Sequence, residues 1–133
     1  HAFVFGKHFV GDWENGKIYE MSQNVFDDFG GELRRQRVAP YVSNEQKAVF
    51  HHRLQIDLDI TGSAPSVTQD WSNDDGTTWS TAVTKAPSVS GKKGRVFFSR
   101  LGDARDRIYR TTISANVKVA ITDALLDVTP GWS

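Results

Sequence analysis

The side chains of this sequence that could do chemistry include neighbouring carboxylates and neighbouring histidines. Asp27-Asp28 and Asp74-Asp75 offer clustered oxygens of the kind that bind calcium or flank a glycosidic bond. Asp27-Asp28 stands beside Gly30-Gly31, which is typical of a turn. Adjacent residues of a strand point to opposite faces, so His51-His52 cannot share one ion without distortion. We therefore expect no metal site, no cofactor and no catalytic residues.

Residues 72–79 read Ser-Asn-Asp-Asp-Gly-Thr-Thr-Trp and fit the Asp-box pattern S-x-D-x-G-x-T-W. In this β-hairpin the Asp carboxylate accepts backbone N–H bonds, glycine supplies a positive φ, and tryptophan packs beneath the next strand. The box is a folding signature, and it assigns Asp74 to its own turn. Its defined positions are Ser72, Asp74, Gly76, Thr78 and Trp79.

Eight arginines form the most informative polar set, because the planar guanidinium suits bidentate pairing with carboxylates or phosphates. Either they pair within the chain, with Asp57, Asp59, Asp103 and Asp106, or they face a neighbouring subunit. The neutral net charge disfavours a third possibility, direct contact with DNA. The eight are Arg34, Arg35, Arg37, Arg95, Arg100, Arg105, Arg107 and Arg110, and our candidate interface residues among them are Arg34, Arg35, Arg37, Arg105 and Arg107.

The four tryptophans divide by their local sequence. Trp71 and Trp79 flank the Asp-box turn, where core packing is expected, whereas Trp13 at a polar turn and Trp132 near the chain end are free to contact a partner or stack on a sugar ring. Trp13 and Trp132 therefore join the candidate interface residues.

Composition sets broad limits on the protein class. The 133 residues suit about one domain, with 16 Lys+Arg against 16 Asp+Glu and no cysteine. This composition excludes disulfides and thiol catalysis, and it argues against a domain that holds nucleic acid mainly by charge. No apolar run approaches the roughly 18 residues of a membrane span. Because strand-like sequence follows His1 at once, we expect the chain to be part of a longer polypeptide.

The elements that position these side chains are predicted to be strands. Phe3–Val10 and Lys17–Met21 flank a turn with Asn15-Gly16, a strong hairpin signal found also in β-propeller blades. Phe50–Ile60 alternates apolar and polar residues with a period of two. Further strands are predicted at Glu32–Val38, Val67–Trp71, Thr78–Ser80, Arg95–Leu101, Ile108–Ser114 and Val117–Thr122, with a loop at Ser88–Gly94 and a compact turn at Leu101–Arg107 that includes a possible helical turn.

These elements predict an all-β protein: an antiparallel, jelly-roll-like β-sandwich. We expect three segments, namely a blade-like hairpin at residues 1–22 left from a propeller, a sandwich with the Asp box at 23–129, and a tail at 130–133. No sustained helical periodicity is present.

The order of several motifs resembles one protein family. These motifs include Gly11-Asp12 with Asn15–Tyr19, Arg34–Arg37 followed by Pro40, Val49–Leu54, the Asp box, Arg100–Arg107 and Val117–Ile121. Together they are similar to the C-terminal part of the packaged-DNA stabilisation, or tail hub, proteins of short-tailed bacteriophages. The similarity spans nearly the whole chain.

The resemblance implies a non-enzymatic virion protein, assembled in the host cytoplasm as a homo-oligomer. It would close the portal channel, stabilise packaged DNA and contact the portal adaptor ring, the tailspike or fibre, and the needle. It implies no membrane association and no specific nucleic-acid binding. Two alternatives stay open, a carbohydrate-binding module and an accessory domain of a sialidase-like protein.

Overall fold

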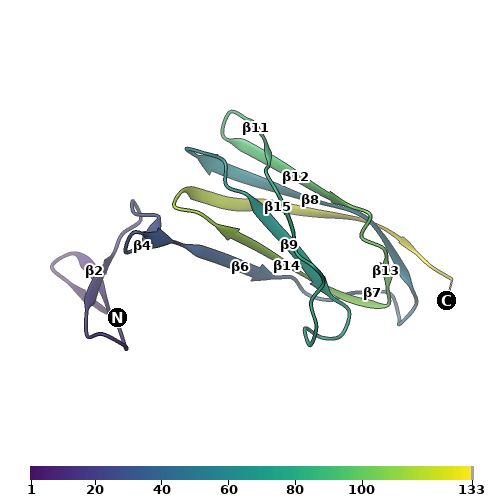
Figure 1. Ribbon diagram of the computed structural model, residues 1–133, viewed down its shortest axis with the longest axis horizontal. Helices are drawn as coiled ribbons and strands as arrows, with labels where there is room; N and C mark the ends of the chain where they lie inside the picture. The colour runs from purple at the N-terminus through teal and green to yellow at the C-terminus, as the bar shows by residue number, and fades with distance from the viewer. Residues whose placement is uncertain (133) are drawn as a thin grey trace.

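The alternation along residues 54–60 builds the centre of the molecule. In the computed structural model, which describes residues 1–132, strand β8 (Val49–Thr61) buries Leu54, Ile56, Leu58 and Ile60 on one face. Apolar residues of a second sheet, among them Val67 and Ile113, join the same core. Two sheets therefore pack face to face over one apolar layer (Figure 1).

Both sheets are antiparallel. The first has the order β10-β9-β14-β6, with β7 also paired to β14, and the second has the order β11-β12-β8, with β13 and β15 also paired to β8. The strands of the first are β6 (Arg34–Val38), β7 (Val42–Ser43), β9 (Val67–Ser72), β10 (Val83–Lys85) and β14 (Asp106–Ser114). Besides β8, those of the second are β11 (Ser88–Ser90), β12 (Lys93–Ser99), β13 (Asp103–Ala104) and β15 (Lys118–Pro130).

The connections explain why this sandwich cannot be divided into independent halves. Only β9–β10 and β11–β12 are hairpins between neighbouring strands of one sheet, while the chain crosses between the sheets after β7, β8, β10, β13 and β14. The predicted all-β antiparallel sandwich is confirmed.

Strand β15 runs further than the sequence indicated. It was expected to end at Thr122, but it continues to Pro130, into the segment assigned to the tail, and pairs with β8 along its length. Register shifts occur between Ile121 and Asp123 and between Asp127 and Val128. An inserted residue reverses the inward and outward alternation, so the strand cannot be followed by a single period of two.

The N-terminal strands form a separate sheet with the order β1-β2-β3, drawn in purple beyond one end of the sandwich (Figure 1). The expected strand Phe3–Val10 is split, because Phe5 and Gly6 turn the chain with φ of 53° and 73°. The strands are β1 (Ala2–Val4), β2 (Lys7–Gly11) and β3 (Ile18–Met21), followed by the two-residue strands β4 (Asp27–Asp28) and β5 (Gly31–Glu32).

Three local predictions were wrong. Residues 78–80 do not form the returning strand, which begins instead at Val83. The loop expected at 88–94 contains β11, and the turn at 101–107 contains β13 and no helical turn.

Within residues 1–132 there is no helix with the length and apolarity needed to cross a bilayer.

Candidate functional site

The Asp-box turn is closed by its serine and aspartate side chains. Asp74 Oδ1 accepts the Thr78 backbone N–H at 2.8 Å, and Asp74 Oδ2 accepts the Thr78 hydroxyl at 2.6 Å. Buried Ser72 donates to Asp74 and accepts the Gly76 N–H at 2.9 Å. Gly76 has a φ of 83°, where a side chain would be strained.

These donors also set the charge of the turn. Hydrogen bonds from Ser72 and then Thr78 lower the pKa of Asp74 to about 2, because they stabilise the ionised carboxylate. Asp74 is therefore a charged structural acceptor near neutral pH. Its neighbour Asp75 accepts a hydrogen bond from the Tyr41 hydroxyl, which fastens the turn to the segment between β6 and β7.

Trp79 covers an ion pair on the outer face of the first sheet. Arg110 donates in bidentate fashion to Asp70, with Nε at 2.9 Å from Oδ1, and its guanidinium lies 3.8 Å from the centre of the Trp79 ring. Asp70 is buried beneath this stack. Trp79 was expected to pack in the core. Its ring lies instead over the Arg110 guanidinium and shields the ion pair from solvent.

Arg107 is a structural residue, which corrects its assignment to an interface. Its side chain is 2% exposed and donates to Asn73 Oδ1 at 2.8 Å, to the Leu101 carbonyl and to the Asp103 carbonyl at 3.1 Å. The guanidinium also lies over the Trp71 ring. It joins the Asp box to the corner between β12 and β13, so it is not available to a partner.

His51 is a buried histidine in the same corner. Its Nδ1 lies 2.9 Å from the Tyr109 hydroxyl, and its Nε2 has no hydrogen-bond partner among the described residues. Burial, followed by the positive charge of Arg107, lowers its pKa to about 4. His51 is therefore neutral near pH 7 and belongs to the core.

The other candidate arginines differ in their surroundings. Arg35 is half-buried and donates to the carbonyls of Ala115 and Val117, both at 3.1 Å, so it holds the β14–β15 loop. Arg34, Arg37 and Arg105 are exposed and form no salt bridge with any residue of 1–132. The structure therefore leaves these three accessible to other molecules.

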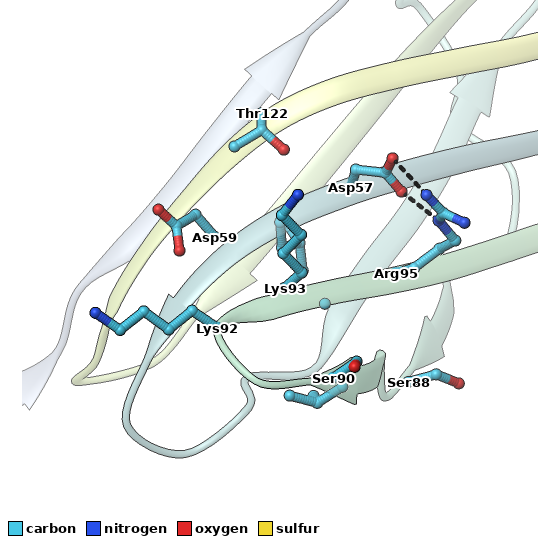
Figure 2. A pocket seen from close by; sticks show the side chains of 11 residues that line it. Asp57, Asp59, Ser88, Ser90, Lys92, Lys93, Arg95 and Thr122 are labelled. Atoms are coloured by element: carbon cyan, nitrogen blue, oxygen red, sulfur yellow. Dashed lines mark hydrogen bonds and ion pairs between the residues drawn. The ribbon is translucent and has the colours of Figure 1, made fainter.

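A hollow of about 810 Å³ lies on the outer face of the second sheet (Figure 2). Along one side Arg95 donates to both carboxylate oxygens of Asp57, at 2.8 and 3.1 Å, which lowers the pKa of Asp57 and raises that of Arg95. Arg95 thus pairs within the chain. Asp59, Lys92 and Lys93 line the same hollow and form no salt bridge in the described part of the chain.

The hollow was not predicted from the sequence, although the charges that line it follow a regular spacing. β12 pairs with β8 so that Arg95 lies opposite Asp57 and Lys93 opposite Asp59. On each strand the two charged residues are two positions apart and lie on the same face. Such matching sets of opposite charge are typical of neighbouring strands. The hollow therefore offers polar groups of both charges.

The exposed tryptophans lie in different parts of the molecule. Trp13 is 90% exposed in the turn between β2 and β3, and Trp132 is fully exposed just after β15. Figure 1 shows the N-terminal sheet and the C-terminal end of β15 at opposite ends. The two rings cannot form one sugar-stacking platform, whereas Trp71 is half-buried against the core.

The structure does not gather ligands for a metal ion. Among residues 1–132, no three histidine, cysteine, aspartate or glutamate side chains lie close enough to hold one. Asp27 Oδ1 accepts the Gly30 N–H at 2.9 Å and closes its own turn. One contact between histidines was not predicted from their spacing in the sequence. The β1–β2 hairpin stacks His1 on His8, with a ring nitrogen of each 2.8 Å apart.

Residues 34–129, from the start of β6 almost to the end of β15, match the family described as Bacteriophage P22 Gp10, beta-sandwich. The chain belongs to this family of short-tailed phage tail hub proteins. It is a structural component of the virion, of a type that interacts with other tail proteins. The resemblance found from the sequence motifs is confirmed. A search of curated proteins found no match.

Proposed function

We propose that this protein is an assembly module that helps the tail hub close the portal channel and retain packaged DNA. Its exposed arginines and mixed-charge hollow dock neighbouring proteins, namely the portal adaptor ring, the tailspike or fibre, or the needle. The module assembles as a homo-oligomer in the host cytoplasm and performs no catalysis. The observation that carries this proposal is the family match over the whole sandwich.

The surface supports such a role. Net charge is zero, while Arg34, Arg37 and Arg105 are exposed and have no carboxylate partner within the described residues. A protein with no net charge but with unpaired charges at particular sites is better suited to selective contact with complementary proteins than to non-specific DNA binding. Wet interfaces with ion pairs at their rims are usual between protein subunits.

We also propose the division into a blade-like segment at 1–22, a sandwich at 23–129 and a tail at 130–133. The N-terminal sheet shares no strand with the sandwich, which supports the first boundary. The second boundary needs refinement because Pro130 belongs to β15, and Ser133 lies outside the described residues. Limited proteolysis should cut between residues 22 and 33 first and leave residues 34–132 resistant.

The decisive experiment introduces Arg34→Ala with Arg37→Ala into the phage and measures tail assembly by sedimentation. We expect incomplete tails and loss of packaged DNA, because both side chains are exposed and unpaired. Arg35 stays unchanged because its removal would release the β14–β15 loop. Lys47→Ala is the matched control, since it removes an exposed positive charge elsewhere on the sandwich.

Normal tails from a folded double variant would remove these two arginines from the interface. Mass spectrometry of purified virions addresses the wider proposal. Peptides of this chain should be present in the particle, and their absence would overturn the structural role and favour carbohydrate binding. In that case Trp13→Ala and Trp132→Ala should each be tested for lost glycan affinity, because the N-terminal sheet that carries Trp13 and the end of β15 that precedes Trp132 lie at opposite ends of the molecule (Figure 1).

A further inference from the structure

The sandwich is open along one side. β6 and β15 are edge strands of opposite sheets, and residues from both line one groove of about 310 Å³, called here the edge groove. Its floor includes Ile56, a core residue that is 1% exposed. At ~30 Å³ per water, the volume equals roughly ten water molecules, enough for a few side chains. The edge groove is lined by Arg37, Ala39, Ile56, Thr111 and residues 121–124.

The groove is open because the side chains of β6 do not cover the apolar side chains of β15. On β15, Ile121 and Ala124 pair with Leu58 and Ile56, so they face the core side of the sheet, yet both are exposed. Arg37 is the residue of β6 that pairs with Thr111 in this region. A polar, exposed arginine cannot cover apolar residues as a leucine would. Inward-facing apolar surface is therefore left without a partner from its own chain.

The groove has a defined chemical preference. Arg37 forms no salt bridge with any residue of 1–132, and Asp123, the carboxylate in the lining, accepts the Ala124 backbone N–H at 2.8 Å. β6 pairs only with β14 and β15 only with β8, so both strands also present unpaired backbone groups along their outer edges. An occupant should therefore bring an apolar side chain for the floor and a carboxylate for Arg37.

One exposed segment of this chain has that composition. Residues 23–33, called here the strap, contain Val25 and Phe29, which are 54% and 75% exposed, and the Phe29 ring also packs edge-on against Tyr19. The strap also carries Asp27, Asp28 and Glu32, none in a salt bridge within the described residues. It turns through β4 and β5 beyond the end of β6 (Figure 1) and is joined directly to that strand, so it does not lie in its own groove.

We propose that the strap of one copy docks in the edge groove of the next copy. Val25 covers Ile121 and Ala124, while the exposed Asp28 pairs with Arg37. A strap and a groove on different parts of each chain make a head-to-tail contact, which repeats and closes into a ring when the rotation permits. The inference rests on the proposed role as an assembly module and names the surfaces that join the subunits.

Cysteine cross-linking tests the contact directly, because the chain has no cysteine of its own. Val25→Cys protein is mixed with Ala124→Cys protein, oxidised and analysed for the mixed disulfide by peptide mass spectrometry. The mixed product should form at least tenfold faster than with Thr77→Cys, an exposed control in the Asp-box loop. Equal rates for the two mixtures would overturn the proposal.

Charge reversal provides an independent test by sedimentation velocity on the full chain. Arg37→Glu and Asp28→Arg should each weaken self-association at least tenfold, and their combination should restore it. Lys47→Glu changes the net charge as much as Arg37→Glu and should have no effect. The proposal would be overturned if the chain were a monomer at every concentration. It would also be overturned if Arg37→Glu left self-association unchanged, because the exposed apolar residues of the N-terminal sheet would then be its source.

The two proposals can fail separately. If the groove variants enter virions normally, only the strap contact is lost and the tail role stands. If the chain self-associates through strap and groove but is absent from virions, the role in the tail is lost and the contact stands.

Discussion

The sandwich and the N-terminal sheet are both antiparallel and use similar turns, but only the sandwich has a core. Ile56, Leu58 and Val67 are almost completely buried. In the N-terminal sheet no residue is fully buried, and Phe5 is 94% exposed. Turn chemistry and alternation are thus sufficient to specify strands, whereas burial decides whether a sheet is stable by itself.

Local polar contacts hold the N-terminal sheet instead. Asp12 accepts hydrogen bonds from the Glu14 N–H at 2.8 Å, the Asn15 amide at 2.7 Å and the Tyr19 hydroxyl at 3.3 Å. Lys7 pairs with Glu20 across two strands. Such exposed contacts shape a turn but contribute little free energy. We expect this sheet to unfold before the sandwich.

Core truncation should give the largest difference between the regions. Ile56→Ala should lower the free energy of unfolding by about 2–5 kcal/mol, because it removes fully buried methyl groups. Ile18→Ala in β3 removes a mostly exposed side chain and should change it by less than about 0.5 kcal/mol. Urea denaturation measures both, and equal losses would mean that the N-terminal sheet is part of the same cooperative unit.

Loss of the buried guanidinium should come next. Arg107→Ala leaves the carbonyls of Leu101 and Asp103 without their donor, so we expect a loss of about 2–3 kcal/mol. The exposed Arg105→Ala is the matched control and should lie within about 0.5 kcal/mol of the parent. Similar values for the two variants would contradict the structural role of Arg107.

The buried histidine should make sandwich stability depend on pH. The folded-state pKa of His51 is about 4 and its ordinary value is 6.5, so its protonation favours the unfolded state. The contribution of neutral His51 to the free energy of unfolding is fully present above pH 6.5 and is lost as the pH falls toward 4. His51→Gln should flatten the stability profile over this range, while His52→Gln should keep it. Denaturant midpoints at several pH values test this.

The Asp-box turn should respond at lower pH. The pKa of Asp74 is about 2 in the folded protein and 3.8 ordinarily, so its stabilisation is present above pH 4 and is lost as the pH falls toward 2. Asp74→Ala should lower the melting temperature at pH 7 and remove this part of the acid sensitivity. Asp12→Ala alters only the N-terminal turn, so it should leave the sandwich transition in place.

The smallest effect is expected for the surface ion pair. Glu20→Gln removes the partner of Lys7, and because both side chains are about half exposed, stability should change by less than about 1 kcal/mol. Added salt should reduce the difference further. A larger change would mean that the N-terminal sheet depends on this pair more than its exposure suggests.

The parts of the fold that could be predicted from sequence are those with local rules. Residues 54–60 alternate without interruption, and Gly76 marks a position that needs a positive φ. The first half of β15 was predicted, but its continuation to Pro130 was missed because the register shift near Thr122 breaks the periodicity. β7 and β13 were missed because two residues are too few to show a pattern.

The candidate site was harder to predict because exposure depends on contacts between distant segments. Arg35, Arg37 and Arg107 look alike in sequence, yet one binds loop carbonyls, one faces an open groove and one is buried against Trp71. Their roles follow from β14 lying between β6 and β9, a pairing of residues far apart in the chain. No local pattern contains that information.

The long pairing of β15 with β8 has a mechanical consequence. β6 begins at one end of the sandwich and β15 finishes at the other (Figure 1), so tension between residues 33 and 131 acts along the strands. Antiparallel backbone hydrogen bonds lie perpendicular to the strands, and under such a shearing load many of them must break together. A domain held at these points should resist extension far better than one pulled open from a hairpin end, which single-molecule force spectroscopy can measure.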